Sequence, residues 1–214
     1  MLFAIDYSPW PIHYSGMKVI GLTGGIATGK SAVAAMLREL GAVIIDADQL
    51  AREIVEPGQE AWRDIVDTFG REVLREDDTI DREKLRKKIF KVEKARKQLE
   101  AITHPRIRAL AEQRMAKLAA EEADLIVYEA PLLFENKVHH WLRPVILVAC
   151  DPATQKRRLR KRDALSEEEV EQHLKAQMPL EEKRELADFV IENDGNLEEL
   201  RGQVEEVWEK ILRG

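Results

Sequence analysis

Apolar residues follow two patterns along this chain. Short runs of consecutive apolar residues, bounded by polar residues or glycine, are typical of buried strands and predict strands at 18–22, 42–45, 124–129, 144–150 and 187–191. Most of the segments between these runs repeat apolar residues at helical spacing instead. Because strands and helices alternate, the sequence predicts an α/β fold in which a parallel five-stranded sheet carries helices on both faces.

A block from Pro57 to about Glu122 interrupts this alternation with charged, mostly helical sequence. Its predicted helices are Glu60–Phe69, Arg82–Phe90 with Asp81 as the N-cap, and a long helix that begins at Thr103-His104-Pro105 and ends near Ala120. This helical block is longer than the single helix that usually connects two parallel strands. We therefore expect an inserted helical lobe over the ligand edge of the sheet, where Arg82 or Arg106 could meet an anionic substrate.

The first predicted strand leads directly into a phosphate-binding motif. Residues 24–31, GGIATGKS, match the pattern G-x-x-x-x-G-K-[ST], and a predicted helix follows them up to Gly41. A glycine loop between a strand and a helix directs backbone N–H groups at a polyphosphate, while the lysine reaches the β- and γ-phosphates and the serine hydroxyl binds Mg²⁺. The sequence thus predicts binding of a nucleoside triphosphate, with ATP contacts from Gly25, Ile26, Ala27, Thr28, Gly29, Lys30, Ser31 and Ala32.

Two aspartates follow the second predicted strand. Asp46 and Asp48 come at its carboxyl end, where ligands of parallel α/β sheets bind. One of them could cap the next helix, and one could bind Mg²⁺ or a substrate hydroxyl. We assign the capping to Asp46 and the chemistry to Asp48, although their spacing alone does not separate the two roles.

A strongly basic run, KRRLRKRD, occupies residues 156–163. It could be a nucleic-acid patch, a solvated helix face, or a lid that clamps phosphate. The lid is favoured because no aromatic residues interleave the run and acidic residues follow from Ser166, which begins a capping box with Glu169. Arg158 and Arg162 lie one helical turn apart and would then act together on the transferred phosphoryl group.

Composition and charge limit the remaining possibilities. The formal net charge is −6, which gives no overall indication of a nucleic-acid partner, and no apolar run approaches the length of a membrane span. The single cysteine, Cys150, cannot form an internal disulfide and is best explained as an apolar residue in a reducing cytoplasm. His139 and His140 are expected at the surface, without a metal. Residues 1–16 contain no lysine or arginine and are interpreted as a poorly ordered N-terminal extension.

Several separated motifs together resemble one family. The phosphate loop, Ile45-Asp46-Ala47-Asp48, Thr103-His104-Pro105 and Pro131-Leu132-Leu133-Phe134-Glu135 occur in the order and spacing of the dephospho-CoA kinases. The similarity continues through Gln155, Arg158, Arg162, Asp163, Gln177, Ala187-Asp188, Asn193 and Gly195. Ala27 and Thr28 stand where residues such as Gly and Ser are usual in the family, but backbone contacts to phosphate should survive this change. Ala32 stands where the family often has Thr, with little expected effect because Ser31 supplies the hydroxyl for the metal.

The resemblance implies a three-layer phosphate-loop kinase that uses ATP and Mg²⁺ to phosphorylate the ribose 3′-hydroxyl of 3′-dephospho-CoA. It implies a nucleotide-binding core (17–60, 121–150 and 186–214), a helical CoA-substrate lobe (61–120) and a lid (151–185). The catalytic residues would be Asp48, Lys30, Arg158 and Arg162, with Mg²⁺ on Ser31 and possible help from Asp48. Asn193 and Gly195 would lie near the adenine, and Asp48, Arg82, His104 and Leu132 would contact the substrate.

Two other functions stay open from the sequence. A related phosphate-loop kinase could act on a nucleoside monophosphate or a similar acceptor. A regulatory module could instead use the nucleotide as a switch for binding protein or nucleic acid, with slow hydrolysis and salt-dependent partner binding. An assay with ATP and dephospho-CoA separates both from the kinase that the resemblance implies.

Overall fold

A computed structural model describes residues 17–90, 92–121, 123–140 and 142–213. The expected N-terminal extension, residues 1–16, lies outside these ranges. The chain divides into two compact units. One contains Asp46–Leu118, and the other contains the described residues up to Ile45 and from Ala119 onward. Each unit is described by itself below.

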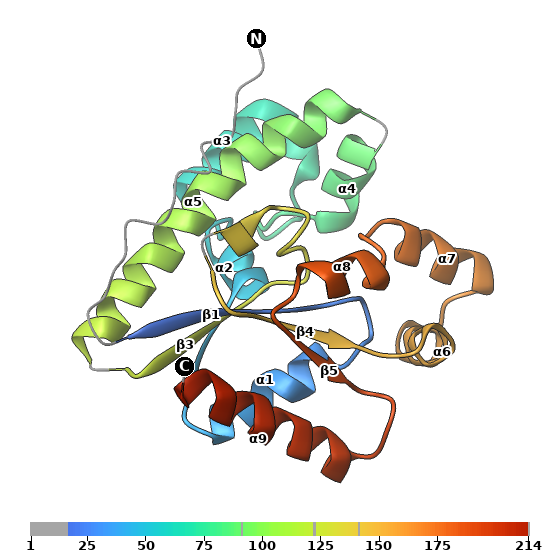
Figure 1. The fold of residues 1–214 in the computed structure, drawn as a ribbon. Helices are drawn as coiled ribbons and strands as arrows, with labels where there is room; N and C mark the ends of the chain where they lie inside the picture. Colours follow the sequence, from blue (N-terminus) through green and yellow to red (C-terminus); the bar gives the residue numbers. More distant parts are fainter. Residues whose placement is uncertain (1–16, 91, 122, 141, 214) are drawn as a thin grey trace. The chain divides into compact units, whose positions relative to one another are not determined.

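The second of these units is built on a five-stranded sheet (Figure 1). Its strands are β1 (Lys18–Gly24), β2 (Val43–Asp46), β3 (Leu125–Glu129), β4 (Val145–Ala149) and β5 (Phe189–Glu192), in the order β2-β3-β1-β4-β5. The pairs β1–β3, β1–β4 and β4–β5 are parallel. The predicted α/β fold with a parallel five-stranded sheet is therefore confirmed.

Among the described residues of this unit, five α-helices and a short 3₁₀ turn, η2 (Val138–His140), accompany the sheet. The α-helices are α1 (Lys30–Glu39), α6 (Pro152–Asp163), α7 (Glu167–Lys175), α8 (Leu180–Leu186) and α9 (Leu197–Arg213). Helices α1 and α9 lie side by side against one face of the sheet (Figure 1), where their buried residues share one apolar core with the strands. That core includes Ile20, Leu22, Val33, Leu37, Val127, Ile146, Val148, Ile191, Leu200 and Val204.

Several polar residues lie at or just after the carboxyl ends of the parallel strands. Strand β1 runs into the phosphate loop, β3 ends at Glu129, Cys150 follows β4, and Asn193 follows β5. Register explains the grouping, because Leu22 of β1 lies opposite Glu129 and Ala149 of β4 lies opposite Glu192. The sheet thereby collects the ends of several strands beside the phosphate loop, as open parallel sheets do at ligand sites.

The other unit is helical. It contains α2 (Ala47–Glu53), α3 (Glu60–Phe69), a short 3₁₀ turn η1 (Arg71–Val73), α4 (Arg82–Phe90) and most of α5 (Glu93–Ala120). Apolar side chains of α3, η1 and α4 form its own core, which includes Ile65, Phe69, Val73, Leu74, Ile80 and Leu85. The predicted bounds of α3 and α4 agree with the structure, and Asp81 caps α4 by accepting hydrogen bonds from Glu83 and Lys84.

The long helix of this unit begins earlier than the sequence suggests. We expected it to start at Thr103-His104-Pro105, but α5 begins at Glu93 and keeps Pro105 in its interior. Proline removes one helical hydrogen bond. Tertiary packing outweighs that loss, because Leu99 and Ile102 on the preceding turns pack against the core of the unit. Within the described ranges, no helix is both long enough and apolar enough to cross a bilayer.

Candidate nucleotide-binding site

The phosphate loop adopts a backbone conformation suited to an anion. Ala27 and Gly29 both have positive φ angles, 61° and 96°, and the Thr28 hydroxyl donates to the Gly25 carbonyl at 2.9 Å. Gly29 is the N-cap of α1 and has no side chain that could bond the first amides of the helix. These amides, and the positive end of the helix dipole, are therefore available to a phosphate group.

Lys30 and Glu129 form an ion pair beside this loop. The Lys30 ammonium contacts the Glu129 carboxylate, and their side chains are only 15% and 9% exposed. Glu129 holds its position because it ends β3, next to β1 in the sheet. The structure thus brings the predicted phosphate-binding lysine together with a carboxylate on the adjacent strand. The sequence predicted a strand over 124–129, which ends at Glu129, but gave no sign of the contact with Lys30.

Asn193 is engaged with the phosphate loop itself. Its amide nitrogen donates to the carbonyl of Thr28 at 2.7 Å, and the residue is buried after β5. A Cβ atom on Gly29 would lie 2.0 Å from the same nitrogen, so Asn193 occupies the space that a side chain at position 29 would need. Gly195, in the turn before α9, is exposed. Contacts of these residues with the adenine stay a prediction.

Arg158 and Arg162 lie one turn apart on α6, but their surroundings differ. Arg158 is half-buried, and within the described parts of the chain its Nη1 atom is buried without a hydrogen-bond partner. Arg162 is exposed and pairs with Asp163 at 2.8 Å. Arg158 lies near Cys150: burial raises the pKa of that thiol to about 11, although the charge of Arg158 acts in the opposite direction.

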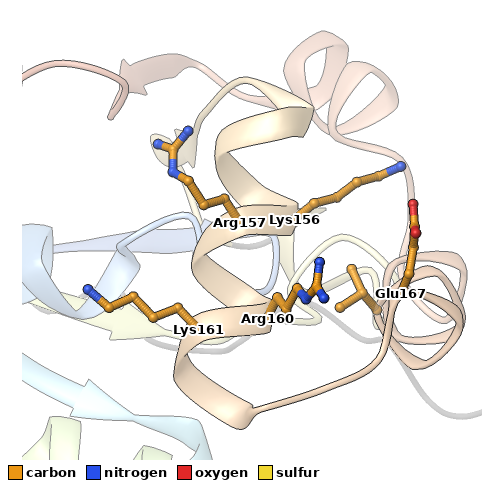
Figure 2. Close-up of a pocket in the computed structure, with 6 residues that line it drawn as sticks. Lys156, Arg157, Arg160, Lys161 and Glu167 are labelled. Atoms are coloured by element: carbon orange, nitrogen blue, oxygen red, sulfur yellow. The ribbon is translucent and has the colours of Figure 1, made fainter.

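The other cations of α6 line a shallow groove beside α7 (Figure 2). Lys156 and Arg160 extend toward the side where Glu167 lies, whereas Arg157 and Lys161 extend to the other side of the helix. Lys156 pairs with Glu171 of α7, and this hydrogen bond raises the pKa of the lysine. Acidic residues of α7 therefore offset part of the basic run. The predicted capping box of Ser166 and Glu169 at the start of α7 is confirmed.

In the helical unit, the two aspartates take different positions. Asp46 is the N-cap of α2 and accepts a hydrogen bond from the Asp48 amide at 2.8 Å, which confirms the capping assigned to it. Asp48 follows in the first turn and is exposed. The carboxylate of Asp46 thus bonds the backbone, and a chemical role for Asp48 stays a prediction.

The expected substrate contacts are spread over both units. Arg82 is exposed on α4, and His104 is half-buried on α5, where burial lowers its pKa. Arg106, also considered for an anionic substrate, pairs with Asp64 at 2.6 Å. Leu132 belongs to the unit with the sheet, where it is 39% exposed.

One expectation for a residue outside the site is wrong. His139 was expected at the surface, but it is buried and packs edge-on against Phe134 with ring centroids 5.2 Å apart. Burial lowers its pKa, so the neutral ring is favoured. His140 is exposed as expected. The sequence did not predict this burial, because it depends on a contact with the Phe134 side chain.

Sequence reasoning also missed a buried lysine. Lys183 on α8 is fully buried and contacts the Glu135 carboxylate at 2.8 Å and the Pro131 carbonyl at 3.1 Å. The same carboxylate accepts a hydrogen bond from the Met178 amide at 3.0 Å. Glu135 had been noted only as part of a family motif, and nothing in the local sequence marks Lys183 as its partner.

Comparison with known proteins identifies the relatives of this chain. The family model described as Dephospho-CoA kinase matches residues 18–199. A Dephospho-CoA kinase of Geobacter sulfurreducens is 52% identical over 194 residues, which cover 91% of this chain and 98% of the relative. Among solved structures, TT1252 from Thermus thermophilus has a TM-score of 0.79 and 37% identity, covering 91% of this chain and 97% of its own. A Dephospho-CoA kinase from Campylobacter jejuni has a TM-score of 0.62 and 31% identity, covering 94% of this chain and 100% of its own.

Proposed function

Because this chain belongs to the dephospho-CoA kinase family, we propose that it transfers the γ-phosphoryl group of ATP to the ribose 3′-hydroxyl of 3′-dephospho-CoA. The products are ADP and coenzyme A, and the reaction completes coenzyme A biosynthesis. The observation that carries this proposal is the family match over residues 18–199, which includes the phosphate loop and its Lys30–Glu129 pair.

The proposed chemistry is positioning and charge neutralisation, as in other phosphoryl transfers. Amides of the phosphate loop and of the first turn of α1 hold the β- and γ-phosphates. The Lys30 ammonium neutralises phosphate charge once a phosphate oxygen replaces Glu129 as its partner. Arg158 and Arg162 bring further positive charge from α6, and the buried, unpartnered Nη1 atom of Arg158 supports a role for this side chain toward an anion.

The residues near the phosphate loop fit a magnesium ion. Ser31 is exposed in the first turn of α1, and Glu129 is the last residue of β3. Oxygen donors suit Mg²⁺, which usually takes few protein ligands and keeps water and substrate phosphates in its shell. Ser31 would hold the ion, and Asp48 stays a possible further ligand. The bound ion would offset negative charge on the transferred group.

We propose that Asp48 orients or deprotonates the 3′-hydroxyl of the acceptor. A positioned general base contributes typically about 10²–10⁴-fold, so Asp48→Asn should lose turnover in that range while its melting temperature stays close to wild type. Asp46→Ala is the matched comparison, because it removes the N-cap and should cost about 1 kcal/mol of stability with most of the turnover retained. If Asp46→Ala lost turnover at normal stability while Asp48→Asn stayed active, Asp46 would be the general base and Asp48 would not.

Three side chains are expected to contact the acceptor. Arg82 would bind its anionic groups, and His104 and the exposed Leu132 would contact the remainder. In this proposal, residues 61–120 form the CoA-substrate lobe and residues 151–185 form the lid. No nucleic acid or membrane takes part, which accords with the net charge of −6 and with the offset cations of α6. A reducing cytoplasm suits the single, buried Cys150.

A coupled assay of ADP formation tests the proposed reaction. Purified protein with ATP and Mg²⁺ should turn over 3′-dephospho-CoA, and mass spectrometry of the product should find one added phosphoryl group at the 3′ position. Nucleoside monophosphates are the control acceptors and should give no turnover above background. Turnover with a monophosphate and none with dephospho-CoA would refute the assignment in favour of a different phosphate-loop kinase.

A further inference from the structure

Two glutamines hold the same residue of the phosphate loop from two directions. The Ile26 amide donates to Oε1 of Gln177 at 2.9 Å, and Nε2 of Gln155 donates to the Ile26 carbonyl at 2.8 Å. Gln155 lies in the first turn of α6, and Gln177 lies between α7 and α8. Both backbone groups of Ile26 are therefore committed to side chains from the segment that we assign to the lid.

The fit around this contact is close. Gln155 is buried, and a Cβ atom on Gly25 would lie 2.6 Å from its Nε2 atom. Glycine at position 25 thus lets the glutamine amide reach the backbone of the loop. The carbonyl of Ile26 requires a donor and its amide requires an acceptor, so each glutamine presents a defined end of its side-chain amide.

Gln177 is itself fixed by the residue that follows it. The Met178 amide donates to the Glu135 carboxylate, which also holds the buried Lys183 ammonium. A buried lysine without a partner is costly, so this ion pair fastens α8 to the segment after β3. The position of Gln177 is consequently set by a buried network, and the phosphate loop is bonded to that network through Ile26.

We propose that Gln155 and Gln177 are positioning residues that hold the phosphate loop in its nucleotide-binding conformation by clamping Ile26 to the start of α6 and to the connection between α7 and α8. Ile26 then serves as the anchor of the loop, and its amide is bonded to Gln177 and not to phosphate. The remaining loop amides are left to the nucleotide. This inference rests on the proposed function only in taking ATP as the nucleotide.

The sharpest test replaces Gln177 by methionine, which keeps the length of the side chain and removes the acceptor. A hydrogen bond of this kind is worth roughly a three- to tenfold change in an equilibrium, so the Kd for ATP should rise by that factor. The KM for ATP should rise similarly, with a smaller change in kcat. Hydrogen exchange at the Ile26 amide, measured without nucleotide, should become faster.

Three further variants separate positioning from a general loss of stability. Gln177→Glu keeps the acceptor and should restore protection of the Ile26 amide. Gln172→Met changes an exposed glutamine of α7 and should leave ATP binding and exchange as in wild type. Gln155→Met should weaken ATP binding like Gln177→Met, and the effects of the two should not add, because both act through Ile26.

Two results would overturn the clamp. One is wild-type ATP affinity in Gln177→Met together with unchanged exchange at Ile26. The other is a lowered melting temperature in Gln177→Met with unchanged ATP affinity, which would make the glutamine merely structural. Calorimetry of ATP binding needs no acceptor, so the clamp is tested even if dephospho-CoA proves not to be the substrate. Failure of the proposed function and failure of the clamp are therefore distinguishable.

Discussion

Replacing Lys30 by methionine should damage catalysis and stability for separate reasons. The ammonium is removed from the phosphates, and loss of one charge-stabilising donor costs about 10²–10³-fold in turnover. The variant also leaves the Glu129 carboxylate, only 9% exposed, without its partner. Breaking a fully buried pair costs about 3–5 kcal/mol, and since both side chains retain some exposure we expect about 1–3 kcal/mol here. For a chain of this size that lowers the melting temperature by roughly 3–10 °C.

A second substitution separates the two effects. In Lys30→Met combined with Glu129→Gln, no uncompensated charge remains, so most of the lost stability should return while turnover stays low. Steady-state kinetics with ATP and dephospho-CoA, together with thermal melts, measure both quantities on the same proteins. Near-normal turnover in Lys30→Met would refute the phosphate-loop assignment. A double variant no more stable than the single one would refute the argument from the buried carboxylate.

Three further predictions concern the lid, the loop and the cysteine. Arg158→Ala and Arg162→Ala should each lower kcat more than they change ATP affinity. Arg160→Ala, on the groove side of α6, should have little effect on either quantity. Equal losses of kcat in all three variants, measured by steady-state kinetics, would indicate a diffuse charged patch. Ala27 has a left-handed backbone conformation, which costs a residue with a side chain about 1–2 kcal/mol. Ala27→Gly removes this cost but adds conformational entropy to the unfolded chain, so the free energy of unfolding in denaturant titrations should rise by up to about 1 kcal/mol. A lower free energy of unfolding in the variant would show that Ala27 is not strained. Because the pKa of Cys150 is raised to about 11, a thiol reagent should modify the native protein slowly at pH 8 and faster toward pH 11, whereas rapid modification at pH 8 would contradict its burial.

The elements that local pattern determines were predictable. The bounds of the helices Glu60–Phe69 and Arg82–Phe90 agree with the sequence, because an apolar face at helical spacing and an N-cap at Asp81 act over a few residues. The strands were found for a similar reason: each is a short apolar run, which the sheet buries completely in β3 and β4 and partly in the edge strands β2 and β5. In such segments the local signal and the tertiary fold favour the same structure.

The predictions failed where packing in the folded chain outweighs the local sequence signal. Pro105 predicts the start of a helix, yet α5 begins at Glu93 and continues past Pro105, because Leu99 and Ile102 pack against the core of the helical unit. His139 follows Val138 and is buried against Phe134, five positions earlier, a contact that depends on how the turn between them folds. Both outcomes depend on three-dimensional packing, which the periodicity of the sequence does not report.

In the candidate site, too, some residues could be predicted from the sequence and others could not. The motif at residues 24–31 predicted the phosphate loop and Lys30, because nucleotide binding fixes glycine, lysine and serine at set spacings. The side chains that hold the loop could not be assigned their roles in this way. Gln155 and Gln177 lie 129 and 151 positions from Ile26 along the chain, and a glutamine has no distinctive pattern of its own.

These supporting contacts bear on how ATP binds. A flexible glycine loop would have to lose conformational freedom when it binds phosphate, and that loss would weaken the affinity. Here Thr28, Gln155, Gln177 and Asn193 already bond the loop backbone, and three of these four side chains are buried. Much of the ordering is therefore completed on folding, since buried polar groups left unpaired would destabilise the chain. The consequence is that the loop can retain left-handed Ala27 and still present its amides in a fixed arrangement to the nucleotide.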